Sequence, residues 1–200
     1  FSIYFGTLLY GLLSRVLGNG CFPKLLFSKK SVLTLEPGLN PDGLMGGVMI
    51  QDHTTDDERL VREVLRSAQE HGADALEHAN VTGWRFNREN KTYEIDVESE
   101  NEKRVFFSRI LIDARGPWVD PDLIVPIAGA HITLKKFTAQ SMILEAGDRR
   151  LFFVINRDGQ ARVGTTERLC RDPDHVRATD EEIDYLLAGL RKYFPKMDFK

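Results

Sequence analysis

The chain has 200 residues, 42% of them hydrophobic, and a formal net charge of -3 at pH 7. This length allows one large domain or two small ones, each with a real core. Because no long Lys/Arg cluster is present, the composition argues against nucleic acid as a partner. With only Cys21 and Cys170, no Cys-x-x-Cys and no His pair at ligand spacing, neither a disulfide framework nor a metal site is predicted. A cytoplasmic protein fits best, and the start at Phe1 suggests a piece of a longer chain.

Residues 1–27 are predicted to be an apolar helical connection, in which Arg15 is the only charge before residue 18. The apolar run is shorter than the ~20 residues that a membrane span needs. Two interpretations remain. A helix packed on its own domain is favoured because the polar face has few Lys or Arg residues, and a helix lying on the membrane surface is the alternative. Peripheral contact with the cytoplasmic membrane therefore stays open.

The next segment predicts a short connection over residues 28–40, a strand over residues 46–52 and a helix over residues 56–71. Thr55 and Glu58 have the spacing of a capping box, and Gly72 is the expected C-terminal cap. The helix carries one apolar stripe at helical spacing, made of Leu60, Val61, Val64, Leu65 and Ala68.

Strands are predicted near residues 74–82, 92–98 and 104–112. The unbroken apolar run Ile110–Ile112 before Gly116 and Pro117 is typical of a strand buried on both faces, and it predicts a mixed sheet with a parallel part. In open α/β sheets ligands bind at this end of a strand. An ordinary buried strand that leaves through a Gly-Pro turn is the alternative.

The second half predicts an antiparallel meander over residues 130–166, with strands at 130–134, 141–146, 151–156 and 161–165. A helix over residues 180–194 follows, with a capping box at Thr179 and Glu182. The predicted fold class is α+β, in which an α/β-type lobe (residues 53–121) is interleaved with an antiparallel-sheet lobe (residues 28–52 and 122–200). Small-molecule sites are common between such lobes.

The sequence has neither a Gly-x-Ser-x-Gly elbow nor a Walker phosphate loop, which disfavours a hydrolase or an NTPase. Among the five histidines, His71 and His175 have the settings of structural or surface residues. His131 differs because it opens the first meander strand, shortly after the Gly116-Pro117 turn. An imidazole with an ordinary pKa near 6.5 can accept a proton at neutral pH.

Several short motifs together carry a resemblance that runs in order through nearly the whole chain. These are Thr55-Asp56-Asp57, Gly116-Pro117-Trp118, Gly129-Ala130-His131-Ile132, Phe153-Val154-Ile155 and Gly164-Thr165-Thr166. The set resembles the FAD-dependent glycerol-3-phosphate dehydrogenases, within the D-amino-acid-oxidase-like flavoproteins. The resemblance implies an FAD-binding lobe and an antiparallel substrate or cap lobe. It also implies oxidation of glycerol 3-phosphate to dihydroxyacetone phosphate, with hydride transfer to FAD and electrons passed to a quinone or to oxygen.

The resemblance also implies roles for individual residues. His131 matches the active-site histidine beside the substrate hydroxyl. The flavin-facing strand end is matched by Ala114, Arg115, Gly116 and Pro117, and the backbone beside the adenine half by Val81. Thr165 and Thr166 are expected only to close the cap sheet.

Two departures and two absences limit the resemblance. Relatives carry Thr or Ala where this chain has Arg115, and Asp where it has Glu167. No Gly-x-Gly-x-x-Gly turn is present, and the phosphate-binding arginine is expected after Lys200. The isolated 200-residue chain is therefore expected to bind FAD poorly and to be inactive.

Two alternatives to a glycerol-3-phosphate dehydrogenase remain at this point. The first is a related flavin oxidase that acts on a different hydroxy or amino acid. The second is a flavoprotein-like interaction module that has lost catalysis, with Arg115 as its symptom. The sequence predicts no oligomeric state.

Overall fold

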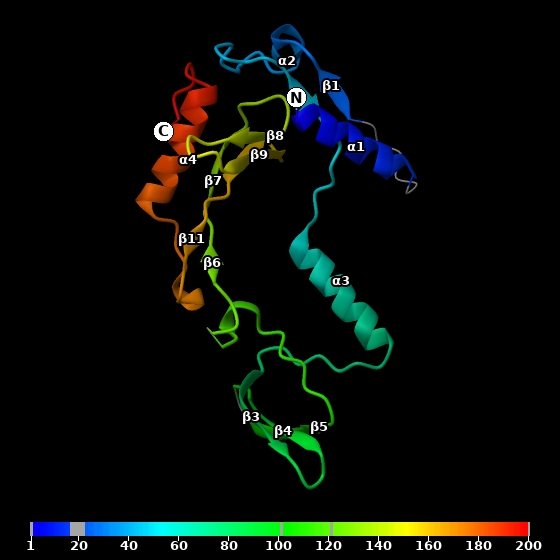
Figure 1. Cartoon of the computed structure of the whole chain (residues 1–200). Helices are drawn as coiled ribbons and strands as arrows, with labels where there is room; N and C mark the ends of the chain where they lie inside the picture. The colour runs from blue at the N-terminus through cyan, green and yellow to red at the C-terminus, as the bar shows by residue number, and fades with distance from the viewer. Residues whose placement is uncertain (1, 17–22, 101, 121, 200) are drawn as a thin grey trace. The chain divides into compact units, whose positions relative to one another are not determined.

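A computed structural model of the chain describes residues 2–16, 23–100, 102–120 and 122–199. The chain divides into two compact units, which are described separately (Figure 1). Unit 1 comprises residues 1–52 and 117–200, and unit 2 comprises residues 53–116. None of the helices in the described ranges combines the length and the apolar composition that a membrane crossing requires.

Unit 1 is built on a four-stranded antiparallel sheet. Its strands are β7 (His131–Lys135), β8 (Met142–Glu145), β9 (Leu151–Arg157) and β10 (Gln160–Gly164), in the order β7-β10-β9-β8. All four predicted strands are therefore present, but the predicted simple meander is wrong for the first of them. β7 pairs with β10 instead of β8, which places His131 directly opposite Gly164.

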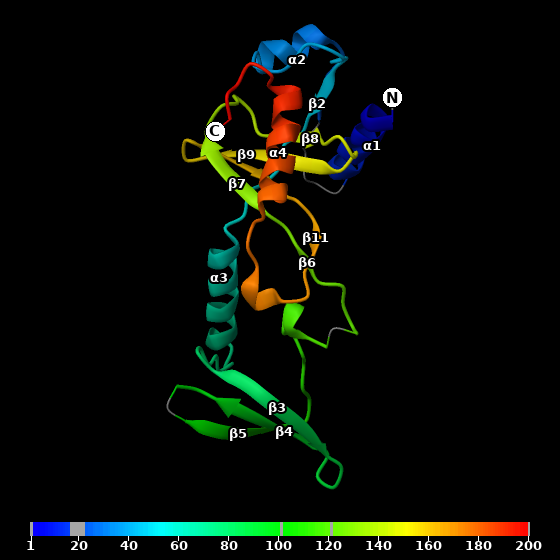
Figure 2. The ribbon, with the colours of Figure 1, turned by 90° about the vertical axis from the view of Figure 1, so that its left-hand side faces the viewer.

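The core of unit 1 lies on one face of this sheet. Because side chains alternate along a strand, every second residue of β9 and β10 points to the same face. These inward residues are packed under helix α4 (Asp180–Tyr193), which crosses the sheet (Figure 2). The most deeply buried side chains of this cluster are Phe152, Val154, Val163, Leu186, Leu190 and Phe194. The opposite face of the sheet, which carries His131, is turned away from this core.

Helix α4 begins at the predicted capping box. The Thr179 hydroxyl accepts a hydrogen bond from the Glu182 amide (3.3 Å), and the Glu182 carboxylate accepts one from the Thr179 amide (3.1 Å). A Cβ at Gly189 would lie 3.0 Å from Phe152 Cε1, so the glycine gives the aromatic ring room to pack against the helix.

The N-terminal part of unit 1 holds α1 (Ser2–Val16), β1 (Lys24–Leu26), α2 (Lys29–Leu35) and β2 (Gly47–Met49). β1 pairs antiparallel with β2, and the Tyr4 hydroxyl donates to the Leu26 carbonyl (3.1 Å). Two further strands, β6 (Ile127–Ala128) and β11 (Arg168–Leu169), form a separate antiparallel pair.

Two predictions for this N-terminal part are wrong. Residues 28–40 are not merely a connection, since Ser28 caps helix α2 by accepting a hydrogen bond from the Ser31 amide (3.2 Å). Helix α1 forms as predicted, but most of its described apolar side chains are exposed, including Phe5 at 72% and Val16 at 76%. Within the described residues α1 is therefore not the core helix that the sequence favours, and the strand it contacts is β2.

Unit 2 begins with helix α3 (Asp57–Glu70). Its N-cap is Asp56, which accepts from the Arg59 amide (3.1 Å), so the cap lies one residue after the predicted Thr55. The helix is followed by Gly72 in the left-handed region (φ 89°), as expected. None of the residues of α3 is buried, so its predicted apolar stripe faces no core within the described chain.

Three antiparallel strands complete unit 2: β3 (Asn80–Asn87), β4 (Thr92–Glu98) and β5 (Lys103–Ser108), in the order β3-β4-β5. β4 matches its predicted range. The first of the three was predicted at residues 74–82 but runs from Asn80 to Asn87, and residues 73–79 contain no strand.

The predicted buried parallel strand at Ile110–Ile112 is wrong. β5 ends at Ser108, which is opposite Tyr93, and Tyr93 is only the second residue of β4. Only Thr92 of β4 lies beyond this pair, so an antiparallel continuation of β5 would pass the end of β4 before it reached the apolar run. No described strand pairs with the run in parallel, and Ile110 and Ile112 are 74% and 81% exposed. All pairings between described strands are antiparallel.

Candidate functional site

His131 lies against the backbone of Gly164. A Cβ atom at position 164 would be 2.5 Å from His131 Cδ2 and 2.8 Å from the Ala130 carbonyl oxygen. Real Cβ atoms do not approach other heavy atoms this closely, so only glycine leaves room for the imidazole here. The sheet register, which pairs His131 with Gly164, therefore places the ring next to bare backbone.

The surroundings of His131 favour the neutral imidazole. Partial burial and, secondarily, the positive charge of Arg162 lower the pKa of His131 below its ordinary value of 6.5. Arg162 lies two residues before Gly164 on β10, so both residues belong to the same face of the sheet. A neutral imidazole can accept a proton.

A buried hydrogen-bond network lies directly behind His131. The Ala130 amide donates to the Thr166 hydroxyl (2.8 Å), and this hydroxyl donates to the Glu182 carboxylate (2.6 Å). The hydrogen bond from Thr166 is the main cause that lowers the pKa of Glu182. Sequence reasoning recognised Glu182 only as a helix cap and Thr166 only as part of the sheet, and the helix capping box was the one signal near this network.

Gly129 makes a second close approach at this point. A Cβ at Gly129 would collide with the Thr165 hydroxyl oxygen and the Thr166 carbonyl oxygen. The Gly-Ala-His and Gly-Thr-Thr motifs, 35 residues apart at their glycines (164 minus 129), therefore meet through their backbones. This contact gives a physical reason for the glycine in each motif.

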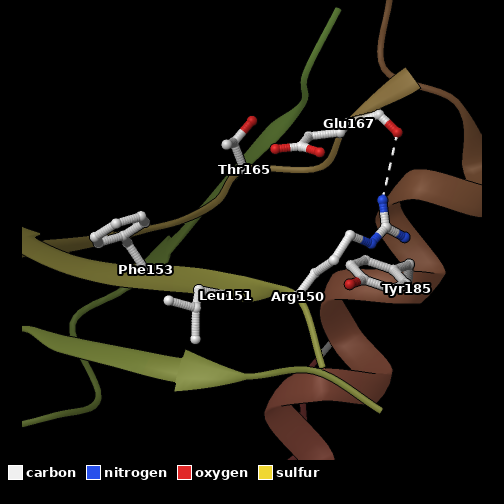
Figure 3. A pocket seen from close by; sticks show the side chains of 6 residues that line it. All are labelled: Arg150, Leu151, Phe153, Thr165, Glu167 and Tyr185. Carbon is white, nitrogen blue, oxygen red and sulfur yellow. Dashed lines mark hydrogen bonds between the residues drawn. The ribbon is translucent and has the colours of Figure 1, made fainter. Parts of the chain in front are cut away.

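An open pocket of about 280 Å³ lies at the end of the same sheet (Figure 3). Within it the Arg150 guanidinium lies 4.9 Å from the centroid of the Tyr185 ring and donates to the Glu167 carbonyl (3.5 Å). Asp148 binds Arg150 Nε (2.7 Å) and the Tyr185 hydroxyl (2.9 Å). No sequence motif predicted this pocket. Its lining residues are Arg150, Leu151, Phe153, Thr165, Glu167 and Tyr185.

Of the predicted flavin-facing segment, Ala114, Arg115 and Gly116 lie at the end of unit 2 and Pro117 belongs to unit 1. Arg115 folds back on its own unit, where its Nε and Nη2 atoms donate to Asp113 (2.8 and 2.7 Å) and its guanidinium lies 5.0 Å from the Trp84 ring centroid. The hydrogen bond from Arg115 is the main cause that lowers the pKa of Asp113. Gly116 has a left-handed backbone (φ 59°), and no atom lies within 4 Å of where its Cβ would be.

The predicted site residues fall into both units. Val81, which is 41% exposed and pairs with Val97 on β4, belongs to unit 2 with Ala114. Pro117, the middle residue of a short 3-10 turn, belongs to unit 1 with His131. The structure thus places Val81 and residues 114–116 in one unit and Pro117 and His131 in the other.

Two other histidines have the structural settings expected for them. His71 Nδ1 lies 2.7 Å from the Ser67 carbonyl oxygen at the end of α3, and His175 Nδ1 lies 2.9 Å from the Asp172 carboxylate. In the described part of the chain, His, Cys, Asp and Glu side chains form no group that could hold a metal ion.

The model of one protein family, described as FAD dependent oxidoreductase, matches residues 9–200. The chain belongs to this family. It is 31% identical over 194 residues to the aerobic glycerol-3-phosphate dehydrogenase of Staphylococcus haemolyticus, which covers 88% of this chain and 35% of that protein. It is 30% identical over 214 residues to the alpha-glycerophosphate oxidase of Enterococcus casseliflavus, which covers 98% of this chain and 35% of that protein.

Solved structures agree on the fold of this FAD dependent oxidoreductase chain. The glycerol-3-phosphate dehydrogenase from Bacillus halodurans, complexed with FAD, matches with a TM-score of 0.78 at 24% identity, over 90% of this chain and 41% of that one. Glycine oxidase from Geobacillus kaustophilus matches with a TM-score of 0.57 at 16% identity, over 94% of this chain and 50% of that one. The predicted two-lobed flavoprotein fold is thereby confirmed. The chain spans about a third of the length of the curated relatives.

The backbone of residues 114–117 is accessible to a planar cofactor. The side of Gly116 that would carry a Cβ is open, and the large Arg115 side chain is held by Asp113 and Trp84. Exposed backbone without a protruding side chain allows the close approach that an FAD ring or pyrophosphate requires. These residues can supply one wall of an FAD site.

Proposed function

We propose that this chain is part of an FAD-dependent glycerol-3-phosphate dehydrogenase, an enzyme of glycerol metabolism that oxidises sn-glycerol 3-phosphate to dihydroxyacetone phosphate. The observation that carries the proposal is the place of His131 at the start of β7, where its ring lies against Gly164 and partial burial and the Arg162 charge lower its pKa. The names of the relatives at 30% and 31% identity support the choice of substrate.

In this proposal His131 accepts the proton of the substrate C2 hydroxyl at an imidazole nitrogen. When bound, FAD supplies the acceptor for the hydride that leaves C2. The carbon loses one hydride and the oxygen one proton, which together convert the alcohol into the ketone. Val81, Ala114, Arg115, Gly116 and Pro117 are proposed to contact FAD, the last four through the backbone of the turn. Residues 53–121 would then belong to the FAD-binding lobe, and residues 28–52 and 122–200 to the substrate lobe.

Anaerobic addition of glycerol 3-phosphate to the full-length, FAD-loaded protein tests this function. We expect bleaching of the flavin absorbance, and turnover when a quinone analogue or oxygen is then supplied. The two additions separate a dehydrogenase from an oxidase, which the names of the relatives do not. Bleaching only by amino acids or by another hydroxy acid would favour the related oxidase. Bleaching by no substrate would favour the interaction module.

The 200-residue chain alone is proposed to retain little FAD and to be inactive, because it contains no Gly-x-Gly-x-x-Gly turn for the pyrophosphate. Purification of this chain in the presence of FAD, followed by gel filtration, tests the proposal. A stoichiometric yellow chromophore in the protein peak would contradict it.

We also propose a cytoplasmic enzyme that touches the membrane through α1, where it would meet its quinone. The exposed apolar side chains of this helix support the idea, among them Phe5, Leu12 and Val16. Co-sedimentation of the full-length protein with anionic lipid vesicles should fall when Phe5 and Leu12 are both replaced by Ser. Unchanged co-sedimentation would remove α1 from the proposal.

A further inference from the structure

We propose that the buried hydrogen bond between Thr166 and Glu182 is a positioning device for His131, which holds the strand start at Ala130 so that the imidazole keeps one orientation against Gly164. This inference rests on the proposed function, in which His131 accepts the substrate proton. Thr166 and Glu182 touch neither substrate nor cofactor in this proposal, and both act through the backbone next to His131.

Thr166 makes hydrogen bonds to both backbone polar groups of Ala130. The Thr166 hydroxyl accepts from the Ala130 amide (2.8 Å), and the Thr166 amide donates to the Ala130 carbonyl (3.3 Å). One residue therefore holds both backbone polar groups of the residue that precedes His131. The contact joins positions 36 apart in sequence, and it lies directly beside the pair His131–Gly164 at which β7 meets β10.

The Glu182 carboxylate determines the direction of the Thr166 hydroxyl. An ionised carboxylate only accepts hydrogen bonds, so the single hydroxyl proton of Thr166 must point to Glu182 Oε1 at 2.6 Å. The oxygen lone pairs are then free to accept from Ala130. The hydrogen bonds that Glu182 receives hold its pKa below the ordinary value, which keeps the carboxylate ionised at neutral pH.

Helix capping alone does not account for this arrangement. The capping interaction occupies Glu182 Oε2, which accepts from the Thr179 amide (3.1 Å) and lies 3.4 Å from Arg168 Nε. Oε1 is committed to Thr166 instead. Thr166 and Glu182 are only 5% and 8% exposed, so loss of Thr166 would leave Glu182 Oε1 buried without its hydroxyl donor, and loss of Glu182 would leave the Thr166 hydroxyl proton buried without its acceptor.

The experiment compares Thr166→Val, which keeps the side-chain shape and removes the hydroxyl, with Thr166→Ser, which keeps the hydroxyl. Both are made in the full-length, FAD-loaded protein. We measure kcat and KM for glycerol 3-phosphate and follow the His131 imidazole through a pH titration by NMR, assigned with His131→Gln. We expect Thr166→Val to lower kcat roughly 10- to 100-fold with KM changed less, because a displacement of about 1 Å costs on that order.

The matched variants separate positioning from folding. Thr166→Ser should restore kcat to within about 3-fold of wild type, since the hydroxyl is the group at issue. Glu182→Gln removes the charge but keeps an amide oxygen that can accept from Thr166, so it should lower kcat less than Thr166→Val does. Glu181→Gln is the control, because Glu181 is the neighbouring carboxylate in the first turn of α4 and no hydrogen bond joins it to Thr166 in the described chain.

Two results would overturn the inference. The first is a folded, FAD-loaded Thr166→Val protein whose kcat and His131 titration equal those of wild type. The second needs no variant: fast hydrogen exchange of the Ala130 amide in the wild-type protein, at the rate of an unprotected amide. If the wild-type protein does not oxidise glycerol 3-phosphate, the proposed function is wrong. The positioning role of Thr166 and Glu182 is then still tested by the NMR titration of His131 and by the hydrogen exchange of the Ala130 amide.

Discussion

The imidazole of His131 rests on Gly164 so closely that a Cβ at position 164 would lie 2.5 Å from its Cδ2 atom. Gly164→Ala must therefore displace either the ring or the strand β10. We expect a loss of about 1–3 kcal/mol in the free energy of unfolding and a marked fall in turnover. Urea unfolding and steady-state kinetics of the full-length protein measure both. Gly147→Ala is the control, because nothing lies within 4 Å of its Cβ position.

Removal of the imidazole itself should affect the chemical step. His131→Ala in the full-length protein should lower kcat by roughly 10²–10⁴-fold, the range for loss of a general base. The FAD content should change little, because the proposed FAD contacts come mainly from other residues. His175→Ala removes an exposed histidine that pairs with Asp172, and it should leave the rate unchanged. Unaltered turnover in His131→Ala would remove His131 from the mechanism.

Arg162 should set part of the acidic limb of the pH profile. The imidazole acts as a base only when neutral, so the rate rises as pH increases through the His131 pKa. Burial and the Arg162 charge both lower this pKa, which moves the limb to a pH below 6.5. Arg162→Gln removes one of the two causes, so the limb should shift to higher pH.

Charge-matched variants control the pH experiment. Arg162→Lys keeps the positive charge and should keep the profile near that of wild type. Lys135→Gln removes a different cation from the far end of β7, and the limb should stay in place. A limb that does not move in Arg162→Gln would show that the arginine charge does not reach the titrating group.

The stability of unit 1 should depend strongly on Phe152. This side chain is 1% exposed and packs beneath α4 in the main core cluster. Phe152→Ala should reduce the free energy of unfolding by about 3–5 kcal/mol, the usual cost for a buried aromatic residue. Phe107→Ala, at a side chain that is 65% exposed, is the control and should change it by only about 0.5 kcal/mol. Chemical unfolding of the full-length protein measures both, and equal losses would contradict the assigned core.

Elements whose signal lies within one segment could be predicted from the sequence. The alternation around Tyr93 and Ile95 predicted β4, and the spacing of Thr179 and Glu182 predicted the start of α4. Elements that depend on a partner strand could not. The apolar run at Ile110 resembles a buried strand, yet the β4 partner has already ended where it would have to pair.

In the candidate site, too, features that lie within one segment could be predicted and features that join distant segments could not. His131 could be singled out because a histidine between a glycine motif and a strand is chemically distinctive. The Thr166–Glu182 hydrogen bond was missed because it joins a strand end to a helix start, and nothing in the local pattern of either residue reveals that they touch. Arg115 is a departure from the Thr or Ala of relatives, and the sequence did not predict where its side chain points. Its side chain contacts Asp113 and Trp84. These contacts depend on the folded structure, and the residue types alone do not predict them.

Helix α3 has a practical consequence for handling this chain. It is held by its Asp56 cap and by surface pairs such as Arg62 with Glu58, and it has no buried residue. A helix of 14 residues with so little tertiary packing is only marginally stable in water. Trypsin, which cleaves after arginine, should therefore nick the chain at Arg62 or Arg66 well before it reaches the strands under α4. Protease inhibitors and short incubations would be needed to keep the purified polypeptide intact.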